Sequence, residues 1–337
     1  MSVRKILLMD RPSYWGSEKQ NLVKDLIPEI RKITQGFQIE YLDKQADLDS
    51  NETTKRTLIT RDAISDVEIV VSFDLGKEAL LKANKLKWLH ILSAGVDHAL
   101  YPELIEHHST MTSSKGSGGI PMAETAIMLM LMLTKNATHY FKSQQQKQWQ
   151  IRQNGELSGM TTGIIGLGHS GADLARKCKA FNMRTLGLRK TNQPCMDIDK
   201  MFTIDNLPQF LSQSDFLIIT TPNTPETNSM IGVNELRIMK PTSYIIVTSR
   251  GGVINDDALI QALDQGLISG AALDAHTTEP LPPENPFWTH PNVIVTPHMA
   301  AGGQLIEERT HKILLDNFER YILGDNLLNI VDKKAGY

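Results

Sequence analysis

The chain has 337 residues, of which 41% are apolar and 22% are charged, and its formal net charge is −3. This length exceeds what one hydrophobic core usually organises, so two domains of a soluble globular protein are expected. The small negative charge gives no electrostatic basis for binding nucleic acid or an anionic membrane surface. The longest apolar run, residues 126–133, is far shorter than the ~20 residues of a membrane span, and it is predicted to be a buried helix.

The two cysteines, Cys178 and Cys195, have neither the spacing of a metal site nor that of a redox pair. Cys178 lies in a helical pattern and is predicted to be a small core residue rather than a reactive thiol. No metal site is predicted. The first residues also lack a signal-peptide pattern, so the sequence predicts a protein of the reducing cytoplasm.

Strands and helices alternate from the start of the chain to about residue 115. Apolar runs predict strands at 5–9, 67–73 and 87–92, and helical spacing predicts a helix at 20–33. This alternation predicts a parallel sheet with helices on its faces.

A loop rich in serine and glycine follows at 113–119 and is a candidate hinge. A long helix is predicted at 120–140, with Pro121 near its start, where a missing N–H group costs little. The methionine and leucine stripe of this helix fits either a core or a subunit interface. A last amphipathic helix is predicted at 304–323.

A second alternating series begins at Met160, with helical stretches between most of its strands. The predicted strands are 161–165, 184–188, 215–220, 244–248, 270–273 and 293–296. This is the pattern of a doubly wound nucleotide-binding fold.

A glycine-rich turn, GLGHSG, connects the first strand of this series to the following helix. Gly166 allows a tight turn, Gly168 lets the backbone approach a pyrophosphate, and Gly171 lets helix and strand pack closely. N–H groups at the helix start would bind phosphate oxygens, which makes Leu167, His169 and Ser170 candidate cofactor contacts.

The end of the next strand indicates which nicotinamide cofactor is preferred. NAD enzymes usually carry an acidic residue about 20 residues beyond the glycines, to bind the ribose hydroxyls. Here Arg189 stands in that position, followed by Lys190 and Thr191. A guanidinium binds a 2′-phosphate with a planar fork, so NADP(H) is predicted to be preferred, with NAD(H) possible. The alternative is that these are solvated charges after a strand.

Three residues of the C-terminal half suit carbonyl chemistry: Arg250 in TSRGG, Glu279 in HTTEPLP and His298 in TPHMA. Taken singly, each has an ordinary explanation as a surface or loop residue. A histidine is the natural proton donor near neutral pH, and a carboxylate beside it stabilises its protonated form and fixes its tautomer. An arginine stays protonated and stabilises the charge that develops on a carbonyl oxygen.

These motifs resemble the D-isomer-specific 2-hydroxyacid dehydrogenase family. The resemblance runs from about residue 86 to 303, is dense from Gly159 on, and is weak over the first 80 residues. It is carried by SAGVD at 93–97, AET at 123–125, GMTTGIIGLGHSG at 159–171, TTPNTPETNSMI at 220–231, the long signature at 239–282, and HPNVIVTPHMAAGG at 290–303.

The resemblance implies a role for each matching residue. His298 is the expected general acid–base that protonates the keto oxygen, Glu279 is its carboxylate partner, and Arg250 clamps the substrate carboxylate and carbonyl. The backbone of the loop at Ser93, Ala94 and Gly95 is expected to bind the substrate carboxylate as well. Asp274 is expected to meet the nicotinamide carboxamide. The remaining cofactor contacts that the resemblance implies are Met122, Thr221, Pro222, Thr227, Thr248, Ser249, Arg250, His298 and Ala300.

The sequence departs from the family pattern at a few positions. Arg189 replaces the usual acid, and TSRGG replaces the commoner NTARG. His276 occupies a position that is often apolar, and it is predicted to be a loop residue rather than a catalytic one. Tyr14, Trp15 and Trp288 are candidates for lining the substrate pocket, although packing is the stronger explanation for each.

The resemblance also implies an α/β architecture of two doubly wound parallel-sheet domains. A Rossmann coenzyme domain at 117–299 is inserted into a flavodoxin-like substrate domain formed by 1–116 and 300–337. The chain crosses between them near Ser117 and Ala300, beside glycines that suit hinges. The helix at 120–140 resembles the family's dimer-forming element, so a homodimer is expected.

The predicted function is therefore an oxidoreductase that reduces a small 2-keto acid to the D-2-hydroxy acid with NADPH. One alternative is a glyoxylate or hydroxypyruvate reductase of the same family. The other is a non-catalytic, nucleotide-sensing binding protein resembling the family's corepressor relatives.

Overall fold

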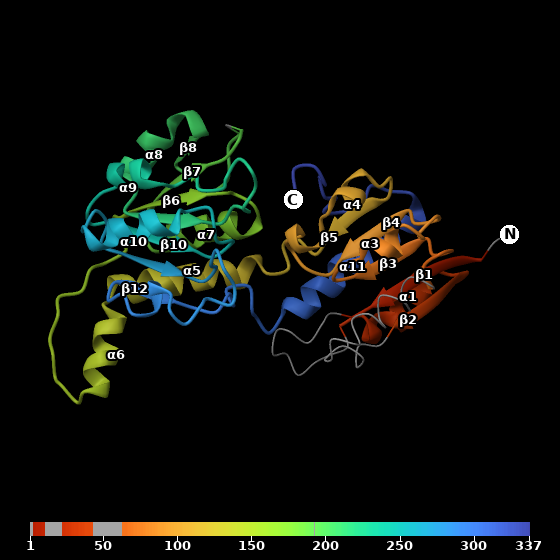
Figure 1. Ribbon diagram of the computed structural model, residues 1–337, viewed down its shortest axis with the longest axis horizontal. Helices are drawn as coiled ribbons and strands as arrows, with labels where there is room; N and C mark the ends of the chain where they lie inside the picture. The colour runs from red at the N-terminus through yellow and green to blue at the C-terminus, as the bar shows by residue number, and fades with distance from the viewer. Residues whose placement is uncertain (1–2, 11–21, 43–62, 192) are drawn as a thin grey trace. The chain divides into compact units, whose positions relative to one another are not determined.

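The computed structural model describes residues 3–10, 22–42, 63–191 and 193–337. The chain divides into two compact units. The terminal unit comprises Met1–Ser117 and Gln304–Tyr337, and the central unit comprises Gly118–Gly303 (Figure 1). Among the described residues, no helix is both long and apolar enough to cross a membrane.

The terminal unit is built on a parallel five-stranded sheet with strand order β2-β1-β3-β4-β5. This is the flavodoxin-like order, in which the direction of winding reverses beside β1. Its strands are β1 (Arg4–Met9), β2 (Phe37–Leu42), β3 (Ile69–Ser72), β4 (Trp88–Ile91) and β5 (Thr110–Ser113). Its helices are α1 (Ile27–Ile33), α3 (Lys77–Leu80), α4 (Pro102–Glu106) and α11 (Ile306–Leu323), with short 3-10 turns η1 (Lys24–Leu26) and η2 (Asp97–Ala99).

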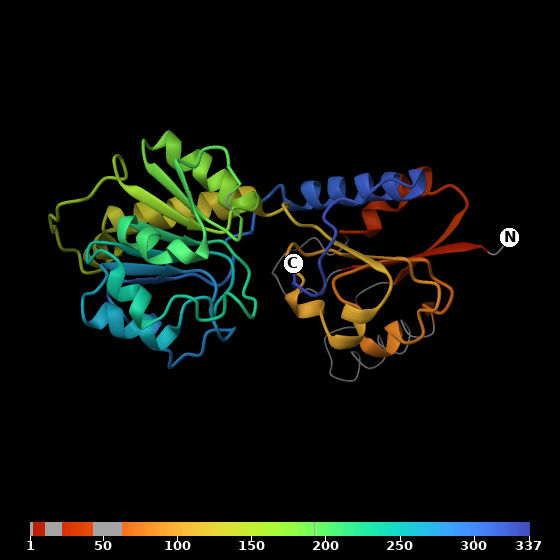
Figure 2. The ribbon, with the colours of Figure 1, turned by 90° about the horizontal axis from the view of Figure 1, so that it is seen from above.

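Helices cover both faces of this sheet, because alternate residues of each strand point to opposite sides. Ile6 and Leu8 of β1 pack in one core with α1 and α11, and Leu7 and Met9 pack in the other with α3 and α4. Figure 2 shows α11 and α1 on one side of the sheet and α3 and α4 on the other.

The central unit contains a parallel seven-stranded sheet with order β12-β11-β10-β9-β6-β7-β8. Counted within this unit, the order is that of a Rossmann fold, with the winding reversal between β6 and β9. Its strands are β6 (Thr161–Ile165), β7 (Arg184–Leu188), β8 (Lys200–Phe202), β9 (Phe216–Ile219), β10 (Tyr244–Val247), β11 (Gly270–Leu273) and β12 (Val293–Val295). Its helices are α5 (Gly119–Thr134), α6 (Ala137–Gln145), α7 (His169–Ala180), α8 (Leu207–Gln213), α9 (Val233–Ile238) and α10 (Asp256–Asp264), with 3-10 turns η3 (Ile204–Asn206) and η4 (Pro286–Trp288).

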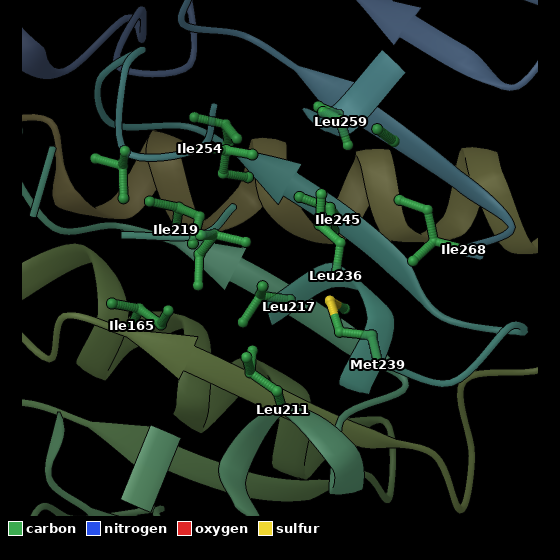
Figure 3. Packing of buried hydrophobic residues seen from close by; sticks show 14 of the residues in the cluster. Ile165, Leu211, Leu217, Ile219, Leu236, Met239, Ile245, Ile254, Leu259 and Ile268 are labelled. Carbon is green, nitrogen blue, oxygen red and sulfur yellow. The ribbon is translucent and has the colours of Figure 1, made fainter. Parts of the chain in front are cut away.

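The central strands are apolar on both faces, as expected when helices cover a parallel sheet on both sides. Ile164 and Ile218 face the core formed with α5 and α7. Their neighbours Ile165 and Ile219 face the core formed with α8, α9 and α10, part of which is drawn in Figure 3. Cys178 of α7 is fully buried in the first of these cores, which confirms its prediction as a core residue.

The predicted α/β class is confirmed, but several elements differ from the sequence analysis. The helix predicted at 120–140 is wrong as a single element, because α5 ends at Thr134 and α6 begins at Ala137. Asn136 between them has φ 54°, a left-handed conformation that asparagine tolerates and that cannot continue a right-handed helix. Its side-chain amide donates to the Gln153 carbonyl at 3.0 Å, which fixes the break.

Three strands were not among the predicted elements: β2, β5 and β8, each of which lies at a sheet edge. β5 is wholly polar apart from Met111, and β8 has only three residues, so neither shows a long apolar run. The described part of the predicted helix at 20–33 consists of η1 and α1, and its first residues lie outside the described ranges.

Candidate active site

The candidate residues of the central unit gather along the edge of its sheet that is formed by the carboxyl ends of the strands. All its strand pairings are parallel, so the loops that follow the strands lie at the same edge. This edge carries the glycine turn after β6, Arg189 after β7, Thr221 and Pro222 after β9, Thr248 to Arg250 after β10, Asp274 after β11, and His298 and Ala300 after β12. Met122 lies in the first turn of α5.

The glycine turn has the shape that a bound pyrophosphate needs. Gly166 has φ 93°, and a Cβ there would lie 2.8 Å from the Thr221 nitrogen. A Cβ on Gly171 would lie 2.0 Å from the Gly166 carbonyl oxygen, so any side chain would push α7 away from β6. Apart from Gly168 itself and its two chain neighbours, no described residue has an atom within 4 Å of the Cβ position of Gly168, the residue before α7. The N-terminus of α7 is therefore open to an anion at this point, and the turn fits the phosphates of a dinucleotide.

Hydroxyl groups brace the loops beside this turn. Thr220 Oγ1 donates to the Gly166 carbonyl at 2.6 Å, and Ser249 Oγ donates to the Thr221 carbonyl at 2.7 Å. Thr227 Oγ1 donates to the Pro222 carbonyl at 2.8 Å and accepts from the Thr224 N–H group. Thr227 and Ser249 were predicted to contact the cofactor. Their hydroxyls shape the loops of their own chain, and contact with a ligand stays a prediction.

Arg189 orders the loop that follows β7. Its Nε donates to the Thr191 carbonyl at 3.3 Å, and its Nη2 donates to the carbonyls of Gln193 at 2.5 Å and Pro194 at 3.4 Å. Nζ of Lys190 lies 3.9 Å from a carboxylate oxygen of Glu226. The predicted basic pair therefore lies at the edge of the sheet, and Arg189 is directed toward its own backbone.

His298 and Glu279 form the closest pair of the three proposed catalytic residues. His298 Nδ1 lies 2.7 Å from Glu279 Oε2, and Glu279 Oε1 accepts from the His276 N–H group at 2.8 Å. Burial raises the pKa of Glu279, but the hydrogen bonds from His298 and His276 outweigh it, so this pKa lies below its ordinary value. Glu279 is therefore held as a carboxylate directed at one ring nitrogen of His298.

Asp274 holds the loop that carries His298. This carboxylate is buried and accepts from Thr296 Oγ1 at 2.6 Å, from the Met299 N–H group at 3.0 Å and from the Ala300 N–H group at 2.7 Å. Within this loop His298 has φ 53°, a left-handed conformation that neighbouring bonds must maintain. The sequence analysis missed this function of Asp274, and its expected contact with the nicotinamide stays a prediction.

Arg250 follows β10, which pairs with β11. Nη1 of Arg250 donates to the carbonyl of the preceding residue, Ser249, at 2.9 Å. Arg250 also lines a small pocket together with Asp256, His276 and Phe287. The three proposed catalytic residues thus follow three adjacent strands of one sheet.

The proposed carboxylate-binding loop belongs to the terminal unit, where it follows β4. Ser93 Oγ donates to the Gly95 carbonyl at 2.8 Å, and the Ser93 carbonyl accepts from the Ser114 N–H group. His90 of β4 braces this region, because its ring nitrogens lie 2.8 Å from Thr112 Oγ1 and 3.1 Å from Ser114 Oγ. Burial lowers the pKa of His90 to about 3, so the ring stays neutral near pH 7.

The aromatic candidates for the substrate pocket receive little support. Tyr14 and Trp15 lie outside the described residues. Trp288 is 49% exposed, and its Nε1 donates to the Pro282 carbonyl at 2.9 Å.

The sequence of the central unit identifies the family. Residues 127–300 match the model of the "D-isomer specific 2-hydroxyacid dehydrogenase, NAD binding domain". The chain belongs to this family. It is 30% identical over 266 residues to a glyoxylate/hydroxypyruvate reductase A of Photorhabdus laumondii, a match that covers 77% of this chain and 84% of the relative.

Two solved structures resemble the whole chain. One is a D-isomer specific 2-hydroxyacid dehydrogenase family protein from Aeromonas salmonicida, with a TM-score of 0.80 and 26% identity, covering 98% of this chain and 100% of the other. The other is an NADPH-dependent glyoxylate/hydroxypyruvate reductase from Sinorhizobium meliloti, solved with NADP and sulfate. It has a TM-score of 0.77 at 23% identity and covers 100% of both chains, and this likeness shows the fold.

Proposed function

We propose that this chain is an NADPH-dependent reductase that converts a small 2-keto acid into the D-2-hydroxy acid, with His298 as the general acid. The observation that carries the proposal is the 2.7 Å contact between His298 and Glu279, at the sheet edge that also carries the glycine turn. The family of the chain supports the same reaction class.

Different residues of the central unit have different roles in the proposed reaction. Nδ1 of His298 faces Glu279, so the opposite nitrogen, Nε2, is the one that gives its proton to the carbonyl oxygen of the substrate. Arg250 binds the substrate and stabilises the negative charge that grows on this oxygen. A reduced nicotinamide, when bound, would supply hydride to the carbonyl carbon. The glycine turn would hold the pyrophosphate at the start of α7.

We assign the coenzyme to the central unit and part of the substrate to the terminal unit. The backbone of the loop at Ser93, Ala94 and Gly95 would bind the substrate carboxylate.

A substrate panel tests the proposed function. Purified protein is given NADPH with glyoxylate, pyruvate, hydroxypyruvate, 2-ketobutyrate, branched 2-keto acids and phenylpyruvate, and the chirality of each product is assigned. Turnover restricted to glyoxylate and hydroxypyruvate would favour the narrower reductase, which the names of two relatives support. Tight NADPH binding without oxidation by any 2-keto acid would overturn the enzyme and favour a nucleotide-sensing binding protein.

The cofactor preference gives a separate prediction. We expect kcat/KM to be higher with NADPH than with NADH, because Arg189 and Lys190 replace the acid that would repel a 2′-phosphate. The hydrogen bonds of Arg189 to its own loop use Nε and Nη2, and a guanidinium has two further donors on Nη1. Arg189→Ala should lower kcat/KM for NADPH about 10-fold or more and leave the value for NADH nearly unchanged. Equal losses with both cofactors, or a clear NADH preference of the wild type, would contradict this assignment.

We also propose that the chain forms a homodimer. Three large apolar side chains in and after α6 are exposed: Phe141 at 56%, Trp149 at 96% and Ile151 at 90%. α6 extends away from the sheet of its unit, which leaves these side chains without a core to enter (Figure 1). Exposed apolar groups gathered in one segment are typical of a protein interface. Sedimentation should give a dimer at assay concentration, and Trp149→Ser should weaken it; a wild-type monomer would refute the proposal.

A further inference from the structure

His276 contacts both loops that carry the His298–Glu279 pair. Its backbone N–H group donates to Glu279 Oε1 at 2.8 Å, and its ring Nε2 lies 3.0 Å from the carbonyl oxygen of Thr296. Thr296 lies two residues before His298, at the end of β12. One residue thus holds the carboxylate with its backbone and the loop of the imidazole with its ring.

The partner of the ring fixes where the proton of His276 sits. A carbonyl oxygen can only accept a hydrogen bond, so Nε2 must carry the hydrogen. The other nitrogen, Nδ1, is buried and has no hydrogen-bond partner among the described residues. An unsatisfied buried nitrogen is a cost to folding that an apolar ring in the same place would not bear. Stability alone therefore does not explain a histidine at this position.

We propose that His276 is a positioning residue, which sets the distance and orientation between Glu279 and His298 by bridging their two loops. The expected effects on kcat and on the pH profile rest on the proposed function. The expected effect on the His298–Glu279 hydrogen bond rests on the geometry alone. The ring bond complements Asp274, which holds the far end of the same loop through Met299 and Ala300. Without the His276 ring, Thr296 would lose this bond and keep its hydrogen bonds to Leu273 of β11 and to Asp274.

Two substitutions separate positioning from packing. His276→Phe keeps the ring shape and the backbone N–H group but removes the donor to Thr296. His276→Gln keeps a side-chain N–H donor of similar reach. His290→Gln serves as the matched control, because His290 is a largely buried histidine of the same unit that pairs with the exposed Asp264. Glu279→Gln provides the reference for a His298 without its carboxylate.

The kinetic expectation is a loss of activity without a loss of stability. His276→Phe should lower kcat about 10-fold through misplacement of the proton donor, with the Kd for NADPH unchanged. Its Tm should stay within about 2 °C of the wild type, because the lost hydrogen bond is offset by removal of the unsatisfied nitrogen. His276→Gln should recover most of kcat, and His290→Gln should match the wild type.

The pH profile gives the signature that a merely structural residue would not move. Glu279 pairs with the proposed proton donor, so loss of this carboxylate or of its alignment with His298 should displace the pH profile of kcat/KM for reduction. Glu279→Gln should show this displacement, and His276→Phe should move in the same direction. Among the described residues, Glu279 and Asp256 interact electrostatically with His276, and Arg250 lines the same small pocket, while His298 and Asp274 lie one contact further away, against Glu279 and Thr296. His276→Phe and His276→Gln both remove the imidazole that interacts with Glu279 and Asp256, so a displacement in His276→Phe that is absent in His276→Gln would come from the bridge itself.

A measurement without substrate keeps this inference separate from the proposed function. A histidine N–H bonded to a carboxylate gives a downfield proton resonance, which is assigned to His298 by its loss in His298→Asn. This resonance should weaken or vanish in His276→Phe and persist in His276→Gln, whether or not the protein turns over a 2-keto acid. A His276→Phe protein with an intact resonance and a wild-type kcat and pH profile would overturn the inference and leave the proposed function standing. A large fall in Tm would also overturn it, since it would show a packing role.

Discussion

His298→Ala should lower kcat/KM for 2-keto acid reduction at least about 100-fold, because the carbonyl oxygen would lose its proton donor. The ring lies 2.7 Å from the Glu279 carboxylate, so its removal also leaves that carboxylate without its main hydrogen-bond partner. Most of the loss should appear in kcat, since the proton is transferred in the transition state. Steady-state kinetics with NADPH and the best substrate of the panel measure the effect.

A second substitution separates the chemistry from the backbone of the loop. His298 has φ 53°, and asparagine adopts this conformation more readily than alanine does. His298→Asn should therefore be as inactive as His298→Ala while it keeps the wild-type Tm. Near-normal turnover of either variant would show that another group supplies the proton.

Arg250→Ala should lower kcat/KM by a similar factor, at least about 100-fold, with a clear increase in KM. A guanidinium binds a carboxylate through two parallel hydrogen bonds and stabilises charge on the carbonyl oxygen, so both binding and chemistry should suffer. Arg250→Lys should recover only part of the activity, because an ammonium group keeps the charge and loses the planar fork. Arg237→Ala, on the exposed side of α9, is the matched control and should behave as the wild type. An Arg250→Ala variant with an unchanged KM for the keto acid would exclude the proposed clamp.

The sequence predicts local features of this fold well. The strand, glycine turn and helix from Thr161 to Ala180 lie as the motif indicates, because Gly166 and Gly171 each meet a steric constraint set by nearby backbone atoms. The strands of both sheets that have four or more apolar residues in succession are likewise predicted close to their observed bounds. Edge strands such as β8 escape prediction, because a three-residue strand on one side of a sheet needs no apolar run.

The relations that the sequence does not reveal are those between loops. Asp274 binds N–H groups 25 and 26 residues further along the chain, and the His276 ring binds a carbonyl 20 residues away. Residue types alone predict neither bond, since an aspartate after a strand suits a cofactor contact and a loop histidine suits solvent. The direction of the Arg189 side chain could not be predicted either. The end of β7 predicts where Arg189 lies, but the carbonyl to which its guanidinium donates belongs to the loop that follows. The break at Asn136 depends on a side-chain bond to a later segment.

Asp274 binds the Thr296 hydroxyl and the N–H groups of Met299 and Ala300, so none of its bonds to the loop uses the side chain at position 298. A variant that is inactive because His298 is replaced should therefore still fold its ligand-binding loops. Such a variant could accumulate a stalled ternary complex of coenzyme and unreacted keto acid, and crystals of that complex would display the bound substrate before reduction.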